Sequence, residues 1–316
     1  MTDISRRSLL QLTGGALGAA ALASTPATTA HAASSQWPGH KPGRIYLGFS
    51  AQYFSTSLRR TGPVGLYRTY YRWSWSEGER RRIASDHAAD RIPWVSFKPP
   101  GEGRSTWRAI ASGRYDAEIR RRARGYASVK KPVIVTFNHE PQNDDPNYGA
   151  DFSRAWCHIH DVMKRETNLE NVVSVPIIGE WTFNPINRRM DHRDWVTPQM
   201  LNRCHFLGID LYQNNTGDGY DERLGRVMDH MARLGHSRKM VGLGETGARN
   251  GWSVPGATWW REQWNWAARN TDKIGAISYF NSQRNNNLGG NWLLWETNAK
   301  LAEYRRGLSS WRSTTL

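Results

Sequence analysis

Eight short runs of apolar and β-branched residues alternate with stretches of helical spacing, and this alternation constrains the fold most strongly. The runs are residues 44–50, 65–71, 92–98, 132–138, 172–178, 205–212, 240–244 and 274–280. The clearest helical stretches are residues 77–89, 115–126, 151–165, 220–234 and 259–270. Strands that alternate with helices form a parallel sheet covered by helices.

The number of units predicts an α/β fold made of a single (β/α)8 TIM barrel. Eight strand–helix units in about 280 residues match such a barrel. A doubly wound open sheet fits the count nearly as well, but no G-x-G-x-x-G motif follows any of the runs. Long connections are expected between the fifth and sixth strands and after the eighth.

The first 32 residues have the pattern of a twin-arginine export signal. Arg6 and Arg7 precede a weakly apolar stretch rich in Gly and Ala, residues 12–23. Residues 30–32 (AHA) then give the spacing of small residues that a signal peptidase requires. We therefore expect residues 1–32 to be cleaved on export from a bacterial cell.

The net charge is strongly positive, with 43 Lys and Arg against 28 Asp and Glu, or +15. Removing residues 1–32 takes away two Arg and one Asp, and leaves +14 on the secreted domain, residues 33–316. This charge favours anionic partners, and export argues against nucleic acid as that partner. We expect electrostatic association with anionic cell-wall polymers. The basic runs 79–82 and 120–124 fall on expected helices, where we expect solvated outer faces.

Tryptophan outnumbers phenylalanine by 16 to 8, and such an excess of amphipathic rings suggests a surface that stacks on a ligand. Rings at or just after expected strand ends are the candidates for binding sugar, although core packing is the alternative for each. We expect substrate contacts from Trp73, Trp181, Tyr279 and Trp292, with Trp75, Trp252 and Trp295 as further candidates. We expect an Asn- and Gly-rich loop, residues 281–291, to lie over the mouth of the barrel.

Two glutamates stand at the C-terminal ends of expected strands, where a barrel carries its chemistry. Glu140 follows the fourth strand and Glu245 the seventh, so the two lie across the barrel mouth from each other. Glycosidic cleavage needs one protonated and one ionised carboxyl, about 5–5.5 Å apart in retaining enzymes and about 6.5–9.5 Å in inverting ones. Either glutamate alone could be an exposed loop carboxylate, but the pair favours catalysis.

The sequence lacks the pattern of a metal site or a disulfide scaffold. His139-Glu140 begins like the zinc motif H-E-x-x-H, but Pro141 follows at once and Asn143 stands where the second His belongs. We therefore expect no metal and no cofactor. Two cysteines are too few for a scaffold, and the sequence leaves open whether they pair.

Several motifs occur together between the fourth and eighth strands. They are His139-Glu140, Phe152, Trp156, His158 and His160 on the next helix, Asn171-Val172-Val173, GIDLY ending at Tyr212, and GLGETG around Glu245. With these motifs the chain resembles the clan of retaining (β/α)8 glycoside hydrolases. It is most similar to glycoside hydrolase family 26 (GH26), which includes β-mannanases, lichenases and some xylanases. The first three strands match that family only by position.

The resemblance implies roles for individual residues. Glu140 would be the general acid/base, and Glu245 the nucleophile. His139 would orient the acid or contact the sugar nearest the cleaved bond. Tyr212 would donate a hydrogen bond to Glu245. Residues 142–145 are polar where the family has an aromatic residue. The resemblance therefore does not identify which polysaccharide is cleaved.

We therefore expect a secreted, monomeric hydrolase that cleaves a β-linked polysaccharide, mannan or β-glucan, by a retaining double displacement. One alternative is a catalytically silent barrel that binds glycans or anionic wall polymers. Another is an exported binder of nucleic acid or wall polymer, whose affinity would fall steeply with salt.

Overall fold

The computed structural model describes residues 37–316, apart from residues 187–190, 215–217, 252 and 284–290. The chain divides into two units, residues 1–33 and 34–316. Every described residue belongs to the second unit. The predicted export signal, the candidate Trp252 and most of the predicted mouth loop lie outside the described residues.

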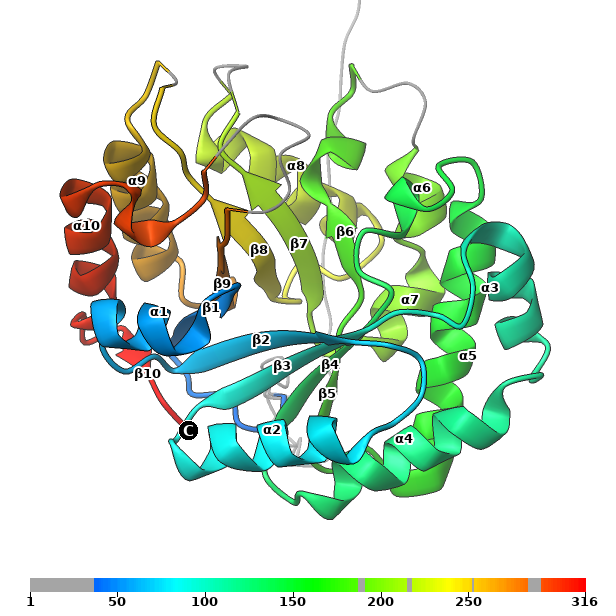
Figure 1. Cartoon of the computed structure of the whole chain (residues 1–316). Helices are drawn as coiled ribbons and strands as arrows, with labels where there is room; N and C mark the ends of the chain where they lie inside the picture. Colours follow the sequence, from blue (N-terminus) through cyan, green and yellow to red (C-terminus); the bar gives the residue numbers. More distant parts are fainter. Residues whose placement is uncertain (1–36, 187–190, 215–217, 252, 284–290) are drawn as a thin grey trace, which may run out of the picture. The chain divides into compact units, whose positions relative to one another are not determined.

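A curled parallel sheet forms the centre of the fold (Figure 1). Among the described residues, its hydrogen-bonded neighbours follow the order β5-β4-β3-β2-β1-β9-β8-β7-β6. The strands are β1 (Ile45–Ala51), β2 (Leu66–Tyr71), β3 (Ile92–Phe97), β4 (Val133–Phe137), β5 (Val172–Ser174), β6 (Ile177–Gly179), β7 (Leu207–Tyr212), β8 (Val241–Gly247) and β9 (Ile274–Asn281). A short strand off this path, β10 (Ser313–Thr314), pairs with β1.

The two ends of the sheet are halves of one predicted strand, residues 172–178. β5 pairs with β4 and β6 pairs with β7, and only Val175 and Pro176 separate the two halves. Proline has no N–H to donate to a ladder, whereas the Pro176 carbonyl accepts a hydrogen bond from Gly208 N at 2.8 Å. The sheet therefore curls back on itself through one stretch of chain, as a (β/α)8 barrel requires.

Helices surround the sheet (Figure 1). They are α1 (Phe54–Thr61), α2 (Glu77–Ala88), α3 (Gly103–Ala111), α4 (Asp116–Ser128), α5 (Gly149–Thr167), α6 (His192–Trp195), α7 (Pro198–Arg203), α8 (Tyr220–Arg233), α9 (Gly256–Arg269) and α10 (Asn298–Leu308). Short 3-10 turns are η1 (Pro141–Asn143), η2 (Glu180–Phe183) and η4 (Leu294–Glu296). The predicted long connection between the fifth and sixth strands holds η2, α6 and α7. Within the described residues, no helix combines the length and apolar character needed to cross a membrane.

Local sequence explains where several helices begin and end. The Ser76 hydroxyl accepts a hydrogen bond from Glu79 N at 3.1 Å and caps α2. The Thr297 hydroxyl accepts from Lys300 N at 3.2 Å and caps α10. Both residues fill the N-cap position, where a side-chain oxygen satisfies a free N–H group of the first turn. Helix α5 ends at Asn168, whose φ of 61° is the left-handed conformation that asparagine tolerates at a C-cap.

Most tryptophans pack inside the protein, which differs from the stacking surface that their number suggested. Trp94, Trp107, Trp195 and Trp260 are at most 1% exposed. Among the described tryptophans only Trp311 is largely exposed, at 65%. The excess of indole rings is therefore mainly a property of the core.

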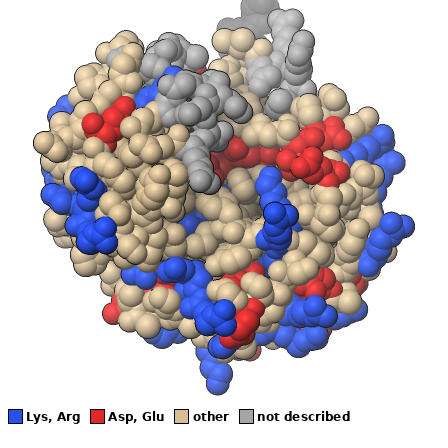
Figure 2. All heavy atoms as spheres, viewed as in Figure 1, with Lys and Arg blue, Asp and Glu red and all other residues tan. Residues whose placement is uncertain are grey.

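The basic runs on α2 and α4 lie mostly on outer faces, as predicted. Arg80 pairs with Glu77, and Arg121 pairs with Glu118 on the same helix. Figure 2 shows Lys and Arg distributed over the visible face, with Asp and Glu among them. Arg122 is the exception, because its side chain is fully buried and bonded to Glu79 at 2.8 Å.

The two cysteines are free thiols. Cys157 is half-buried and Cys204 is buried. Burial raises the pKa of Cys157 to about 11 and that of Cys204 to about 12. Because the thiolate is the reactive form, both thiols are inert at neutral pH.

Candidate functional site

The turn after β4 presents the first predicted glutamate. Asn138 and Glu140 both have left-handed backbone angles, with φ of 45° and 48°. The side chain of Asn138 holds this turn in place. Its Oδ1 accepts from Trp107 Nε1 at 3.0 Å, and its Nδ2 donates to Asp144 Oδ2 at 2.7 Å. Such strained backbone persists only where surrounding contacts fix it, and it is frequent at functional sites.

The carboxyl of Glu140 favours its protonated form. Burial, followed by the nearby charge of Glu245, raises its pKa to about 8, although Arg68 and Lys98 oppose this shift. Asn143 Nδ2 donates to Glu140 Oε2 at 3.0 Å and orients the group. A carboxyl in this environment can donate a proton at neutral pH.

The second glutamate, Glu245 on β8, receives hydrogen bonds on both oxygens. Tyr70 donates to Oε1 at 2.7 Å, and Tyr212 donates to Oε2. The Arg68 guanidinium approaches Oε1 at 3.4 Å. Two hydroxyl donors and one cation stabilise a negative charge on this carboxylate. The two glutamates are thus set up for different roles.

Both tyrosines remain hydrogen-bond donors over the physiological range. Desolvation of the two hydroxyls beside Glu245 raises the pKa of Tyr70 and of Tyr212 well above the ordinary value, although the Tyr70 side chain as a whole is 41% exposed, and the charge of Glu245 adds to the effect in both cases. A hydroxyl that stays protonated can hold the carboxylate in one orientation throughout a reaction. Tyr212 was predicted in this role, whereas Tyr70 was not.

A buried charged network lies beneath Glu245. Arg68 Nη1 is 3.4 Å from Glu245 Oε1 and 3.5 Å from Asp210 Oδ1, and all three side chains are at most 7% exposed. Arg68 Nε donates to Ser96 Oγ at 3.2 Å. Burial and the charge of Glu245 raise the pKa of Asp210 well above its ordinary value. One guanidinium therefore faces two carboxyl groups, of which Asp210 favours the neutral form.

The sequence contains a signal for the missed residues on β2. Arg68 and Tyr70 are two positions apart, so both side chains point to the same face of the strand. That face is the interior of the barrel, because both side chains reach Glu245. A single charged residue inside the apolar run 65–71, Arg68, was the signal in the sequence that a polar group lies inside the barrel.

Gly244 is required by this network, which leads to a stability prediction. A Cβ at this position would lie 2.6 Å from Asp210 Oδ1 and 2.6 Å from Ile177 Cδ1. We expect Gly244→Ala to destabilise the protein by about 1–3 kcal/mol, the usual effect of overpacking a core. Gly225→Ala is the control, since nothing lies within 4 Å of its Cβ position in α8, and alanine favours helix. Urea denaturation measures both, and equal stability of the two variants would contradict the prediction.

The other predicted substrate contacts divide into two groups. His139, Trp181 and Trp292 lie near the glutamates or their hydrogen-bond partners, although Trp292 is buried, at 3% exposure. His139 Nε2 is 4.0 Å from Glu245 Oε1, and the Trp292 ring centroid is 4.9 Å from that of Tyr212. The half-buried Trp181 lies across Gly179 at the end of β6, beside Gln142.

Trp73 and Tyr279 are instead part of the core. Trp73 is 8% exposed and packs against Phe97 and Phe137. Tyr279 is fully buried against Trp260, and its hydroxyl donates to the Ala248 carbonyl at 2.9 Å. Both take the packing role that was the alternative for these rings, and neither is brought to the glutamate pair.

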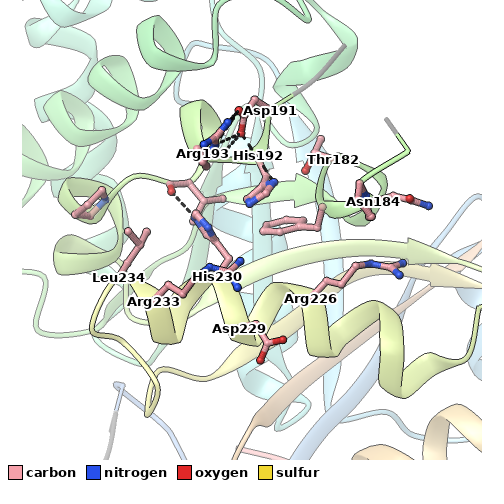
Figure 3. Close-up of a pocket in the computed structure, with 14 residues that line it drawn as sticks. Thr182, Asn184, Asp191, His192, Arg193, Arg226, Asp229, His230, Arg233 and Leu234 are labelled. Atoms are coloured by element: carbon pink, nitrogen blue, oxygen red, sulfur yellow. Dashed lines mark hydrogen bonds and ion pairs between the residues drawn. The ribbon is translucent and has the colours of Figure 1, made fainter. Parts of the chain in front are cut away.

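A separate cavity of about 1000 Å³ lies between α6 and α8 (Figure 3). It contains His192 and His230, whose rings meet edge-on with centroids 4.5 Å apart. Its carboxylates do not form a reacting pair, because Asp191 is bound by Arg193 and Asp229 points away from the two histidines (Figure 3). The paired glutamates therefore remain the candidate site.

Metal ligation is not suggested by the described part of the chain. Within it, no three His, Cys, Asp or Glu side chains are grouped closely enough to hold an ion. The carboxylates around the site face tyrosine, arginine and asparagine donors, which are partners for hydrogen bonds.

Comparison with known proteins gives matches only at the level of structure. No protein-family model matches the chain, and no curated protein matches its sequence. A GH26 β-mannanase from Bacteroides ovatus aligns with a TM-score of 0.60 and 12% identity, over 86% of this chain and 90% of that one. A fungal β-1,4-galactanase aligns with a TM-score of 0.59 and 13% identity, over 82% and 93% of the two chains.

A ruminal GH26 endo-β-1,4-mannanase gives a similar result. It aligns with a TM-score of 0.57 and 14% identity over 87% of this chain. The aligned part is 65% of the ruminal protein, so the chain spans slightly less than two thirds of that mannanase. The chain thus has the barrel fold of the GH26 β-mannanases.

Proposed function

We propose that the protein is a glycoside hydrolase that cleaves β-linked polysaccharide with retention of configuration. The observation that carries the proposal is the pair of glutamates in opposite environments. Glu140 has a pKa of about 8 and favours the protonated form. Glu245 is held by Tyr70, Tyr212 and Arg68, which favour its charged form. This division of roles is what glycosidic cleavage requires.

The first step would form a covalent glycosyl-enzyme. A Glu245 oxygen attacks the anomeric carbon, and the bond from that carbon to the leaving oxygen breaks. Glu140 transfers its proton to that oxygen, so the departing sugar leaves as a neutral alcohol. In the second step the Glu140 carboxylate takes a proton from water. The water oxygen attacks the anomeric carbon, and Glu245 is released as a carboxylate.

His139 would serve as a neutral contact in this scheme. Burial, with the positive charges of Arg68 and Lys98, lowers its pKa well below the ordinary value. A neutral ring beside Glu245 leaves the nucleophile's charge available for attack. It can still exchange hydrogen bonds with a sugar hydroxyl.

Mannan or a β-glucan is the proposed substrate. Support comes from similar folds in β-mannanases, a β-1,4-galactanase and an endo-β-1,4-glucanase. We expect the protein to release reducing sugar from at least one of mannan, mixed-linkage glucan, xylan or an acidic polysaccharide. Release from none of these four would contradict mannan or β-glucan as the substrate.

Removing one hydroxyl donor tests the arrangement around the nucleophile. We expect Tyr212→Phe to lower kcat by about 10- to 100-fold, because the phenyl ring keeps the packing against Trp292 and loses only the bond to Glu245. Tyr304→Phe is the control, since it also removes one buried hydroxyl. That hydroxyl donates to the Gly48 carbonyl of β1 and not to Glu245. Steady-state kinetics on the preferred polysaccharide measures both. An unchanged kcat in Tyr212→Phe would contradict the assigned role.

We propose that the enzyme is secreted and works near anionic wall polymers. The support is the twin-arginine pattern of residues 1–32 and the charge of +14 on the remaining chain. Fusing residues 1–32 to a reporter protein tests export. Replacing Arg6 and Arg7 together by Lys should block it, and export of that variant by the same route would contradict the proposal.

A further inference from the structure

The largely exposed tryptophan, Trp311, lies at the end of the barrel opposite the two glutamates. Its side chain is 65% exposed, and it stands in the turn that leads into β10. β10 pairs in parallel with the first two residues of β1, at the N-terminal edge of the sheet. Glu140 and Glu245 belong to the C-terminal ends of their strands, which form the mouth of a barrel. A ligand held at Trp311 is therefore separate from the candidate active site.

Two guanidinium groups lie beside this indole ring. The Cζ atoms of Arg312 and Arg44 are 3.7 Å and 5.4 Å from the ring centroid. Arg312 Nη1 also donates to the Gly43 carbonyl at 3.1 Å, which fixes its position. A guanidinium held over an aromatic face keeps N–H groups at its edge, and these can bind a carboxylate through two parallel hydrogen bonds. The ring therefore orients two cations without neutralising them.

A cavity of about 460 Å³ adjoins the ring and extends this basic surface. Arg44 connects the two, because it lines the cavity and also lies over Trp311. Lys41 lines the cavity as well, and its Nζ donates to the Thr315 carbonyl at 2.7 Å. No Asp or Glu is among the described residues that line it. We call Lys41, Arg44, Trp311 and Arg312 together the Trp311 patch.

The cations of the Trp311 patch have no carboxylate partners among the described residues. The side chains of Lys41 and Arg312 bond to main-chain carbonyls, and that of Arg44 contacts the indole ring. Elsewhere on the surface, Arg121 pairs with Glu118 on the same helix at 3.1 Å. Unpaired cations that lie together produce a positive potential, which attracts and orients an anionic ligand.

The indole ring decides which kind of anion fits the Trp311 patch best. A pyranose ring presents C–H groups that pack on an aromatic face, and a uronate carries its carboxylate on that same ring. One sugar unit can therefore contact Trp311 and a neighbouring guanidinium together. A phosphate polymer without rings would use the cations and leave the indole exposed. Nucleic acid has both rings and charge, but the proposed export argues against it.

We propose that the Trp311 patch is a second binding site, which holds an acidic polysaccharide through its uronate units. Trp311 packs on the sugar ring, and the guanidinium and ammonium groups of the patch bind the carboxylates. The choice of ligand rests on the proposed secretion, whereas the site itself needs neither glutamate. Because the patch and the barrel mouth lie at opposite ends of the strands, the protein can hold one chain while the glutamates act on another.

Calorimetry with two matched hexasaccharides tests the ring. Both have the β-1,4 linkage, one built of mannuronate and the other of mannose, and both are titrated into Glu245→Ala so that neither is cleaved. We expect the addition of Trp311→Ala to weaken mannuronate binding by about tenfold and to leave mannose binding unchanged. Trp311→Phe keeps an aromatic face and should recover most of the affinity. Mannuronate binding that ignores Trp311 would overturn the proposal.

Two double variants of equal net charge test the cations. Arg44→Ala with Arg312→Ala should weaken mannuronate binding by about tenfold or more. Arg80→Ala with Arg121→Ala is the matched control, because it removes the same charge from the outer faces of α2 and α4. The control should stay within about twofold of its parent, since distant exposed charges are screened by salt. Equal weakening in the two double variants would mean attraction by net charge alone, and would overturn the site.

Competing polyanions and the wild-type reaction separate the remaining outcomes. We expect inorganic polyphosphate to bind independently of Trp311, since it has no ring. Single-stranded DNA that binds more tightly than mannuronate and depends on Trp311 would identify a nucleic-acid site and overturn the proposal. A wild-type protein that cleaves no polysaccharide, but whose mannuronate binding depends on Trp311, would support the patch and overturn the hydrolase. Cleavage without such binding would do the reverse.

Discussion

Replacing Glu245 by alanine is expected to lower kcat/KM on the preferred polysaccharide by about 10⁴-fold or more while the protein remains folded. The carboxylate is the group that would attack the anomeric carbon, and no other described carboxylate receives the same set of donors, Tyr70, Tyr212 and Arg68. The fold should persist, because removing the charge of Glu245 removes one cause of the raised pKa of Asp210, so that Asp210 can pair with Arg68 as a carboxylate. Near-ultraviolet circular dichroism measures whether the variant keeps the tertiary structure of the wild type.

Azide distinguishes a lost nucleophile from a damaged site. In Glu245→Ala the anion can occupy the space of the missing carboxylate and attack an activated aryl glycoside. The expected product is the α-glycosyl azide, formed with a partial recovery of turnover. Glu222→Ala is the matched control, because this glutamate on α8 is 62% exposed and pairs with Arg226 on the same helix. Full activity in Glu245→Ala would contradict the account, as would a comparable loss in Glu222→Ala.

Replacing Glu140 by glutamine should produce a loss that depends on the leaving group. We expect kcat/KM on polysaccharide to fall by about 10²- to 10⁴-fold, the usual contribution of general acid–base catalysis. An aryl glycoside whose leaving group needs no proton should lose much less in its first step. Steady-state rates on both substrates give the ratio. Equal losses on the two would contradict the role of Glu140 as proton donor.

The same residue should set the alkaline limb of the activity profile. With a pKa of about 8, Glu140 is protonated at neutral pH and loses its proton as the pH rises. Activity of the wild type on polysaccharide should therefore decline through about pH 8, and this limb should be absent from the residual activity of Glu140→Gln. A wild-type profile that stays level to pH 10 would contradict the assignment.

The raised pKa also makes stability depend on pH. The folded carboxyl keeps its proton up to about pH 8, whereas the unfolded chain loses it near the ordinary value of 4.5. The contribution of this group to stability is therefore complete below about pH 4.5, and it is lost as the pH rises to about 8. In that window the stability of Glu140→Gln should fall less than that of the wild type, as thermal denaturation at several pH values measures.

Sequence alone was sufficient to find the catalytic candidates, because their positions follow from strand ends. Glu140 stands two residues after one buried apolar run, and Glu245 directly follows another. The pattern of strands alone therefore places both glutamates at the mouth of the barrel. Tyr212 ends another such run, and its role beside Glu245 followed from the resemblance to GH26. The structure brings its hydroxyl to Glu245.

The remaining site residues depend on which face of a strand they occupy, and buried parallel strands conceal this. Both faces of β2 are apolar near its start, so Arg68 and Tyr70 were read as parts of a strand and not as interior groups. Tyr279 was expected at the mouth because it ends a strand, but its side chain points outward to Trp260. The hydrophobic pattern predicts where a residue stands along a strand. The face to which its side chain points follows only from how the strand pairs with its neighbours.

The split strand had a readable signal in the sequence. Pro176 lies inside the run 172–178, and proline within a run argues against an uninterrupted strand. The structure uses this break to turn from the pairing with β4 to the pairing with β7.

The anomeric configuration of the first product tests the central claim most directly. Proton NMR of a hydrolysis reaction, recorded before mutarotation, shows which anomer the enzyme releases. A double displacement at Glu245 predicts that the β-anomer appears first and the α-anomer only later, as the free sugar equilibrates. Initial release of the α-anomer would mean a single inverting displacement by water, and would contradict Glu245 as the nucleophile.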